Sequence, residues 1–185
     1  MENIVIIDFE TTQNQESRKE EIIEFAAIEL DKELNEISRM HKMINPNIPL
    51  TYITKKVTGI TESDLTNKPK INEELPKILD YLNNKIIIAH NANFDYTVIK
   101  NSCEKLNLKF NGKIVIDSLK IAKNLFPNER NGLAHLKRRF NIYTNHHRAQ
   151  DDVIATKEVF LKLMEVYDGS RLTKLIDDLH LFSVS

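Results

Sequence analysis

Apolar residues along the chain gather in five short segments, and polar residues follow each of them. The segments cover residues 4–7, 22–30, 37–44, 86–89 and 114–116. They are short and rich in isoleucine and valine, which is typical of buried strands rather than of helices. The pattern therefore predicts five strands.

Other parts of the chain carry apolar residues at helical spacing. Leu75, Ile78, Leu79 and Leu82 would lie on one face of a helix. Similar spacing predicts helices over residues 94–106, 119–126, 133–140, 151–167 and 172–181. Between the third strand and these helices, Val57-Thr58-Gly59-Ile60-Thr61 predicts a turn with glycine as its permissive residue.

The order of these elements predicts the fold class. Short polar links join the first three strands, which suits antiparallel hairpins, whereas the last two strands follow helical crossovers. This order indicates an α/β fold with one mixed sheet and helices on both of its faces. The first strand, as the most apolar, should be central. No linker rich in glycine, proline or serine divides the 185 residues, so we expect one domain over 1–185.

Composition and charge narrow the classes of function. The net charge of −1 provides no broad basic field, so nucleic acid would have to be bound locally or through metal ions. Cys103 is the single cysteine, which excludes an internal disulfide and a thiolate zinc cluster. The first residues lack the basic charge of a signal peptide, and no segment approaches the length of a membrane span. We expect a cytoplasmic protein without membrane contact.

Two acids, Asp8 and Glu10, follow directly after the first strand. Side chains alternate along a strand, so both carboxylates point to the same face. Two neighbouring carboxylates repel each other, and a hard divalent cation with oxygen ligands would relieve that repulsion. An isolated Asp-x-Glu more commonly belongs to a solvated loop, so the metal hypothesis depends on further acids at the same place.

One further acid follows the strand at 86–89. Sites in such sheets lie at the carboxyl ends of central parallel strands, where this strand leads into His90-Asn91-Ala92-Asn93-Phe94. Asp95 would lie in the first turn of the next helix, with Asn93 as its N-cap. Asp95 could equally serve the helix dipole. The Phe94 ring could stack on a base or pack in the core.

The last candidate group is His146-His147-Arg148-Ala149-Gln150-Asp151-Asp152. Residues five apart in a continuous helix lie about 140° apart, so His147 and Asp152 can share a site only if the histidine precedes the helix. The imidazole pKa lies near neutrality, which suits proton abstraction from water. Four acids could hold two divalent ions about 3.5–4 Å apart and promote phosphodiester hydrolysis. The alternative is a helix N-cap by Asp151 or Asp152 beside solvated histidines.

Three motifs in combination resemble those of the DEDDh (DnaQ-like) 3′→5′ exonucleases. They are Asp8-Phe9-Glu10, His90-Asn91-Ala92-Asn93-Phe94-Asp95 and His147-Arg148-Ala149-Gln150-Asp151-Asp152. Residues 21–27, 57–61 and 115–119 resemble further segments of the family. The resemblance covers about residues 3–166, with a C-terminal helical segment at 170–185. It implies a ribonuclease H-like fold with a central mixed five-stranded sheet.

The resemblance also implies roles for individual residues. The acids that would bind two divalent cations, Mg²⁺ or Mn²⁺, are Asp8, Glu10, Asp95 and Asp152. The general base would be His147. The residues that it implies to contact the 3′-terminal nucleotide are Thr11, Thr58, Gly59 and Ile60. Asn91 and Phe94 are further candidates for binding nucleic acid.

The doubled histidines and aspartates allow two registers, because both pairings give His-x4-Asp. We choose His147 with Asp152, since Asp152-Val153-Ile154-Ala155-Thr156 resembles the family's continuation after its last acid. Phe9 and Gln13 stand where the commonest first motif has threonine and glycine. An Asp-Phe-Glu core also occurs in an RNA-trimming branch, whereas other segments resemble proofreading members equally well.

We therefore expect a hydrolase that releases 5′-mononucleotides from the 3′ end of single-stranded or frayed DNA or RNA. One alternative is the proofreading exonuclease of a DNA polymerase assembly, which would imply a polymerase or another replication, repair or RNA-processing partner. Another alternative is a module that binds nucleic acid without cutting it. The presence of all four acids places that last alternative below the other two.

Overall fold

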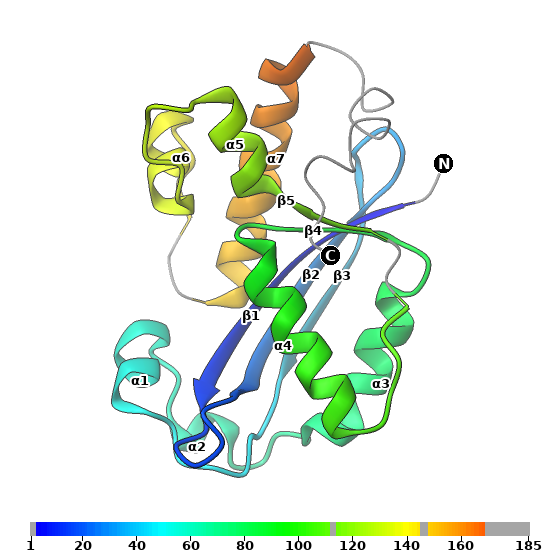
Figure 1. Ribbon diagram of the computed structural model, residues 1–185, viewed down its shortest axis with the longest axis vertical. Coiled ribbons are helices and arrows are strands. Elements are labelled where there is room, and N and C mark those ends of the chain that lie inside the picture. Colours follow the sequence, from blue (N-terminus) through cyan, green and yellow to red (C-terminus); the bar gives the residue numbers. More distant parts are fainter. Residues whose placement is uncertain (1–2, 112–113, 145–147, 169–185) are drawn as a thin grey trace.

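Five strands form one mixed sheet in the order β3-β2-β1-β4-β5 (Figure 1). The structure is a computed structural model that describes residues 3–111, 114–144 and 148–168. The strands are β1 (Ile4–Gln13), β2 (Glu20–Leu30), β3 (Glu36–Met43), β4 (Ile86–Ala89) and β5 (Ile114–Asp117). β1 pairs antiparallel with β2 and parallel with β4. The mixed sheet and the central first strand confirm the sequence prediction.

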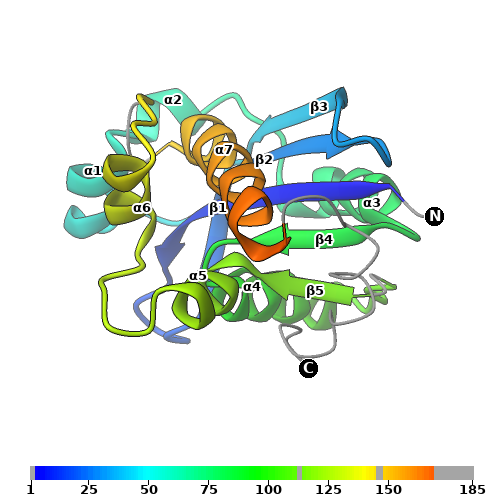
Figure 2. The ribbon, with the colours of Figure 1, turned by 90° about the horizontal axis from the view of Figure 1, so that it is seen from above.

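Helices cover both faces of the sheet (Figure 2). One face packs against α3 (Ile71–Leu82) and α4 (Ala92–Lys105), and the other against α5 (Ser118–Leu125), α6 (Leu133–Arg139) and α7 (Ala149–Asp168). The alternation of β1 divides its residues between the two cores. Ile4 and Ile6 lie in the α7 core, whereas Val5 and Ile7 lie in the α3–α4 core. Each core buries one apolar stripe of the central strand.

The same alternation continues into the polar end of β1. Phe9 belongs to the α3–α4 core, where its ring centroid lies 4.8 Å from that of Phe25. Asp8 and Glu10 therefore point to the opposite face, toward α7. The β1–β2 register then shifts between Glu10 and Thr11. Such a bulge bends a strand and increases its twist, and bulges are frequent beside functional sites.

Two short helices, α1 (Tyr52–Thr58) and α2 (Glu62–Leu65), flank the turn that the sequence predicts. Gly59 ends α1 with φ of 70°, in the left-handed region. The sequence prediction missed both helices, because they are short and α1 leaves Tyr52 and Ile53 exposed. Neither helix therefore has an amphipathic pattern from which it could be predicted.

The N-cap of α4 is Asn91, so the prediction of Asn93 is wrong. The chain turns directly from β4 into the helix with Asn91 at φ of 71°. Its backbone N–H donates to Asp117 Oδ1 at 3.0 Å, and the same oxygen accepts from the N–H of Leu119 at 2.9 Å. One carboxylate at the end of β5 therefore fixes the beginnings of both α4 and α5.

None of the helices in the described ranges is long and apolar enough to cross a membrane.

The left-handed conformation at Gly59 predicts which substitutions this turn tolerates. Gly59→Ala should lower the free energy of unfolding by about 1–2 kcal/mol, because a Cβ disfavours positive φ. Open space surrounds the position, since a Cβ would meet no atom within 4 Å. Gly59→Asn should cost less, because asparagine adopts this conformation readily and does so at Asn47, Asn84, Asn91, Asn107 and Asn141. Denaturant unfolding tests this order, and an alanine variant as stable as the asparagine variant would contradict it.

Candidate active site

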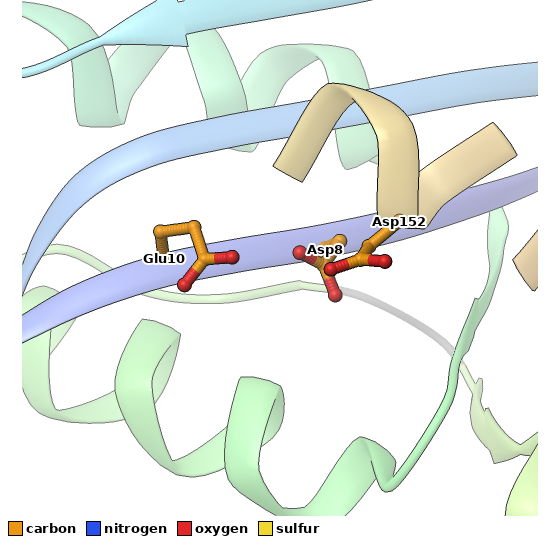
Figure 3. Close-up of side chains that lie close together, drawn as sticks. All are labelled: Asp8, Glu10 and Asp152. Atoms are coloured by element: carbon orange, nitrogen blue, oxygen red, sulfur yellow. The ribbon is translucent and has the colours of Figure 1, made fainter. Parts of the chain in front are cut away.

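Three carboxylates converge in the C-terminal half of β1, which continues to Gln13, so the prediction that Asp8 and Glu10 follow the strand is wrong: both are paired with β2. Asp8 and Glu10 come from the strand and Asp152 from the first turn of α7, and each offers an oxygen atom within 4.8 Å of the others. Figure 3 shows the carboxylates of Asp8 and Asp152 side by side, with Glu10 next along the strand. Acids far apart in the sequence therefore meet at one point.

The packing of α7 on the sheet brings Asp152 to this point. Ala149 and Val153 are fully buried in the core between α7 and the sheet. The N–H of Asp152 donates to the carbonyl oxygen of Arg148 at 2.9 Å, which closes the first turn. Asp152 rather than Asp151 joins the cluster, in agreement with the register that we chose. Asp151 instead lines a surface cavity with Tyr143.

Asp95 lies in the first turn of α4 and is 3% exposed. The backbone N–H of Phe9, between the two acids of β1, partly offsets the effect of burial on the pKa of this carboxyl. Asp95 is not one of the three residues whose oxygens meet within 4.8 Å. It nevertheless acts on them through its charge, which is the second cause, after burial, of the raised pKa of Asp8.

Burial and mutual repulsion favour the protonated forms of these acids. Burial, and then the charges of Asp95, Glu10 and other acids, raise the pKa of Asp8 well above its usual range. Burial followed by the charges of Asp152 and Glu24 raises the pKa of Glu10 to about 7. Burial is also the main reason why the pKa of Asp95 rises to about 8. The nearby charge of Arg148 opposes the rise in the pKa of Glu10 but does not outweigh burial and the neighbouring acids.

This donor set fits a hard divalent cation. Carboxylate oxygens are the ligands that Mg²⁺, Mn²⁺ and Ca²⁺ prefer, and the convergence of three of them is costly without a positive charge. Asp8, Glu10 and Asp152 could supply these ligands, and Asp95 could contribute through its charge at the edge of the cluster.

A surface groove runs from Glu10 toward α1. Its lining includes Glu10 and two residues predicted to contact nucleic acid, Thr11 and Thr58. Ile53 and Val57 of α1 line the same groove and are 71% and 43% exposed. The sequence argument missed these two apolar residues, because their exposure becomes evident only once α1 is known.

The other residues predicted to contact nucleic acid differ in exposure. Gly59 presents open surface, and Phe94 is 40% exposed on α4 rather than packed in the core. Asn91 is exposed as well. Ile60 is 1% exposed and packs with Ile23, Leu50 and Leu65, so its side chain supports the turn from inside.

His147, the predicted general base, lies outside the described residues, as does His146. The chain before and after them is held by buried groups. Lys137 is 3% exposed and donates to the carbonyl oxygen of Thr144 at 2.8 Å. Arg148 pairs with the buried Glu24 at 3.0 Å. Both cations are therefore held by contacts within the protein.

The site geometry can now be compared with known proteins. The model of the RNase_T family, described as an exonuclease, matches residues 5–160. The chain belongs to this exonuclease family. The match confirms the resemblance to DEDDh exonucleases, and with it the prediction of a hydrolytic enzyme of the 3′→5′ exonuclease type.

Proteins similar to this RNase_T exonuclease include DNA polymerases and exonucleases. The PolC-type DNA polymerase III of Caldanaerobacter subterraneus subsp. tengcongensis is 36% identical over 163 residues, which are 87% of this chain and 11% of that polymerase. Among solved structures, Exonuclease X in complex with 5′ overhanging duplex DNA is 25% identical, with a TM-score of 0.72 and coverage of 94% and 98% of the two chains. The nuclease domain of 3′hExo, a DEDDh family member bound to rAMP, is 20% identical, with a TM-score of 0.77 and coverage of 92% and 95%. At that identity the likeness supports the fold alone.

The raised pKa of Glu10 predicts how stability depends on pH when a chelator removes divalent metal. The folded protein holds a proton on Glu10 up to about pH 7, whereas an unfolded glutamate loses it near 4.5. Stability contributed by this protonated form is therefore lost as pH rises from about 4.5 to about 7. Glu10→Gln removes the cost of an ionised carboxylate at this buried position. It should stabilise the metal-free protein at pH 8 by roughly 1–3 kcal/mol.

Thermal unfolding at pH 5 and pH 8 in chelator measures this effect. Glu33→Gln, at an exposed position of the β2–β3 turn, is the matched control and should leave the pH dependence unchanged. Saturating Mn²⁺ should stabilise the unsubstituted protein more than Glu10→Gln. Equal pH dependence in all three proteins would contradict the electrostatic account of the cluster.

Proposed function

We propose that this chain removes 5′-mononucleotides one at a time from the 3′ end of single-stranded or frayed DNA or RNA. The observation that carries the proposal is the convergence of Asp8, Glu10 and Asp152, of which Glu10 also lines a surface groove that leads toward α1. The groove provides a path for a strand, and the acids provide the position at which its terminal phosphodiester would be cut.

In this proposal, Asp8, Glu10 and Asp152 hold two divalent cations, Mg²⁺ or Mn²⁺, and Asp95 completes the ligand set. The cations, when bound, supply the positive charge that offsets the charge of the reacting phosphate. The carboxylates fix where that charge lies, because β1 and the first turn of α7 are both held by the buried core. Asp95 is buried in the first turn of α4, close enough for its charge to act on Asp8.

His147 would take the proton from the attacking water. The water oxygen forms the new bond to phosphorus as the bond to the 3′ oxygen of the preceding nucleotide breaks. That oxygen takes up a proton, and the terminal residue leaves as a 5′-mononucleotide. The role of His147 rests on the family resemblance and on its place in the chain, directly before the turn that carries Asp152.

The terminal nucleotide would lie in the groove between β1 and α1. Thr11 and Thr58 line it, Gly59 lets a strand approach closely, and Ile53 and Val57 offer apolar surface to a base. Phe94 and Asn91 are exposed at the start of α4, the helix that carries Asp95. An exposed ring there could stack on a base, since every base has a π-face. Ile60 would support the turn from within the core.

A second candidate is proofreading within a DNA polymerase assembly. The specific observation that favours it is the 36% identity with a PolC-type DNA polymerase III over 87% of this chain. The chain spans only 11% of that polymerase, so the likeness concerns one part of a much larger protein. A polymerase or another replication, repair or RNA-processing protein would then be the partner, and frayed DNA would be the preferred substrate.

Asp152→Asn is the first test of this function, with Asp151→Asn as its matched control. The purified protein, with 5′-labelled single-stranded DNA or RNA and Mg²⁺ or Mn²⁺, should give a ladder that shortens from the 3′ end. Asp152→Asn should lower the rate by at least about 100-fold, because even outer partners of metal ligands contribute 10–100-fold. Asp151→Asn, one residue away but outside the cluster, should change it little.

Each outcome of that assay separates the candidates. A clear preference for frayed DNA over RNA would favour proofreading, and the reverse would favour RNA trimming. Tight binding of both nucleic acids without cleavage in either metal would overturn the nuclease and support a binding module.

His147→Ala tests the general base. The loss of a positioned base should lower the rate of cleavage by about 10²–10⁴-fold, with little change in metal affinity. His146→Ala is the control for the other register and should retain most of the activity. Single-turnover rates over pH 5–9 measure both variants. If His146→Ala lost the activity and His147→Ala retained it, the assigned register would be wrong.

A further inference from the structure

Glu24 is an acid inside the sheet that the metal centre does not use. It lies on β2 with a fully buried side chain, and its oxygens accept five hydrogen bonds. Oε1 accepts from His41 Nε2 at 2.8 Å and from Arg148 Nε and Nη2 at 3.3 and 3.0 Å. Oε2 accepts from Arg148 Nε and from the Ala149 N–H, both at 3.1 Å. Both oxygens are therefore engaged.

The register places Glu24 directly beside the metal centre. Glu24 pairs with Glu10 across β1 and β2, so both side chains lie on the α7 face of the sheet. Burial raises the pKa of the Glu24 carboxyl, but the hydrogen bonds from Arg148, His41 and Ala149 outweigh it and hold that pKa below its usual range. Glu24 thus stays ionised next to the three acids without having a free oxygen for a metal.

The partners of Glu24 point to what it does. Arg148 and Ala149 form the start of α7, and the carbonyl oxygen of Arg148 accepts from the N–H of Asp152 at 2.9 Å. One carboxylate on β2 therefore holds the turn from which Asp152 reaches the acids of β1. The contact joins residues 124 and 125 positions apart in the sequence.

We propose that Glu24 is a positioning residue of the metal centre, which anchors the first turn of α7 so that Asp152 meets Asp8 and Glu10. The inference rests on the proposed metal site and deepens it. Arg148 is its essential partner, because the guanidinium contacts both carboxylate oxygens in a fixed geometry that an ammonium group cannot reproduce.

An ordinary buried ion pair would stabilise the fold without affecting the metal. The chain offers such a pair on the same strand. Glu29 is 8% exposed and accepts from Lys85, Asn3 and Ser38 at 2.8–2.9 Å. None of these partners belongs to α7. Glu29→Gln is therefore the matched control for Glu24→Gln.

The test measures Mn²⁺ binding by calorimetry without nucleic acid, together with thermal unfolding in chelator. Glu24→Gln should bind Mn²⁺ at least about 10-fold more weakly, as expected for a partner that orients a metal ligand. Glu29→Gln should bind Mn²⁺ as the unsubstituted protein does, even if both variants lose thermal stability. Equal Mn²⁺ affinity in the two variants would overturn the inference.

A charge-conserving variant separates position from charge. Arg148→Lys keeps the net charge but loses the two-oxygen contact, and it should weaken Mn²⁺ binding several-fold. Its control is Arg39→Lys, because Arg39 makes a similar paired contact with Glu36. The two arginine side chains are similarly exposed, at 49% for Arg39 and 42% for Arg148. Normal Mn²⁺ affinity in Arg148→Lys would show that Glu24 acts through its charge alone, and would overturn the positioning role.

The nuclease assay on the same proteins keeps this inference distinct from the proposed function. Mn²⁺ binding that depends on Glu24 in a protein that cuts no nucleic acid would support the positioning role and overturn the nuclease. If the unsubstituted protein cleaves nucleic acid and Glu24→Gln leaves the Mn²⁺ affinity unchanged, the nuclease is supported and the positioning role is overturned. Absence of Mn²⁺ binding in the unsubstituted protein would overturn both.

Discussion

Repulsion among the carboxylates at the end of β1 is the constraint around which this structure is built. Asp8, Glu10 and Asp152 place their oxygens within 4.8 Å of one another, with Asp95 close enough to act on Asp8. Such an arrangement opposes folding, so the surrounding core must hold it. It does so through the two apolar stripes of β1, which pack against α7 on one face and against α3 and α4 on the other. The strand that carries the acids is therefore also the strand most firmly held.

Strand alternation and crossover order made much of this predictable from the sequence. A period of two sends Asp8 and Glu10 to one face and Phe9 to the other, whatever the neighbouring elements are. The short links after the first two strands and the helices before the last two likewise determine the sheet order. The α1 helix could not be predicted, because a helix of 7 residues with exposed apolar side chains has no amphipathic signature. Asn91 was missed as an N-cap because its positive φ depends on Asp117, a contact between distant residues.

Part of the candidate site could likewise be predicted from the sequence, and part could not. The resemblance to the family selected Asp8, Glu10, Asp95 and Asp152, and the structure brings oxygens of Asp8, Glu10 and Asp152 within 4.8 Å of one another. Glu24 lies in the segment 21–27 that resembles the family, but the resemblance implied no role for it, and β2 carries three other glutamates. Its significance follows only from the meeting of β2 with the start of α7, which puts Arg148 and the Ala149 N–H on its two oxygens. Candidate metal ligands can be recognised from a sequence motif, whereas a residue that orients them is recognised from its tertiary contacts.

This arrangement couples the metal site to the completed fold. Asp8 and Glu10 come from the first strand and Asp152 from the last described helix, so the three acids cannot meet until the sheet and α7 have docked. A cation that binds only the docked state stabilises that state in proportion to the logarithm of its concentration. Glu24 lies where the sheet meets α7, because it is on β2 opposite Glu10 of β1 and accepts a hydrogen bond from the first residue of α7. A cation can therefore offset the repulsion among these carboxylates only after the sheet and α7 have assembled the site.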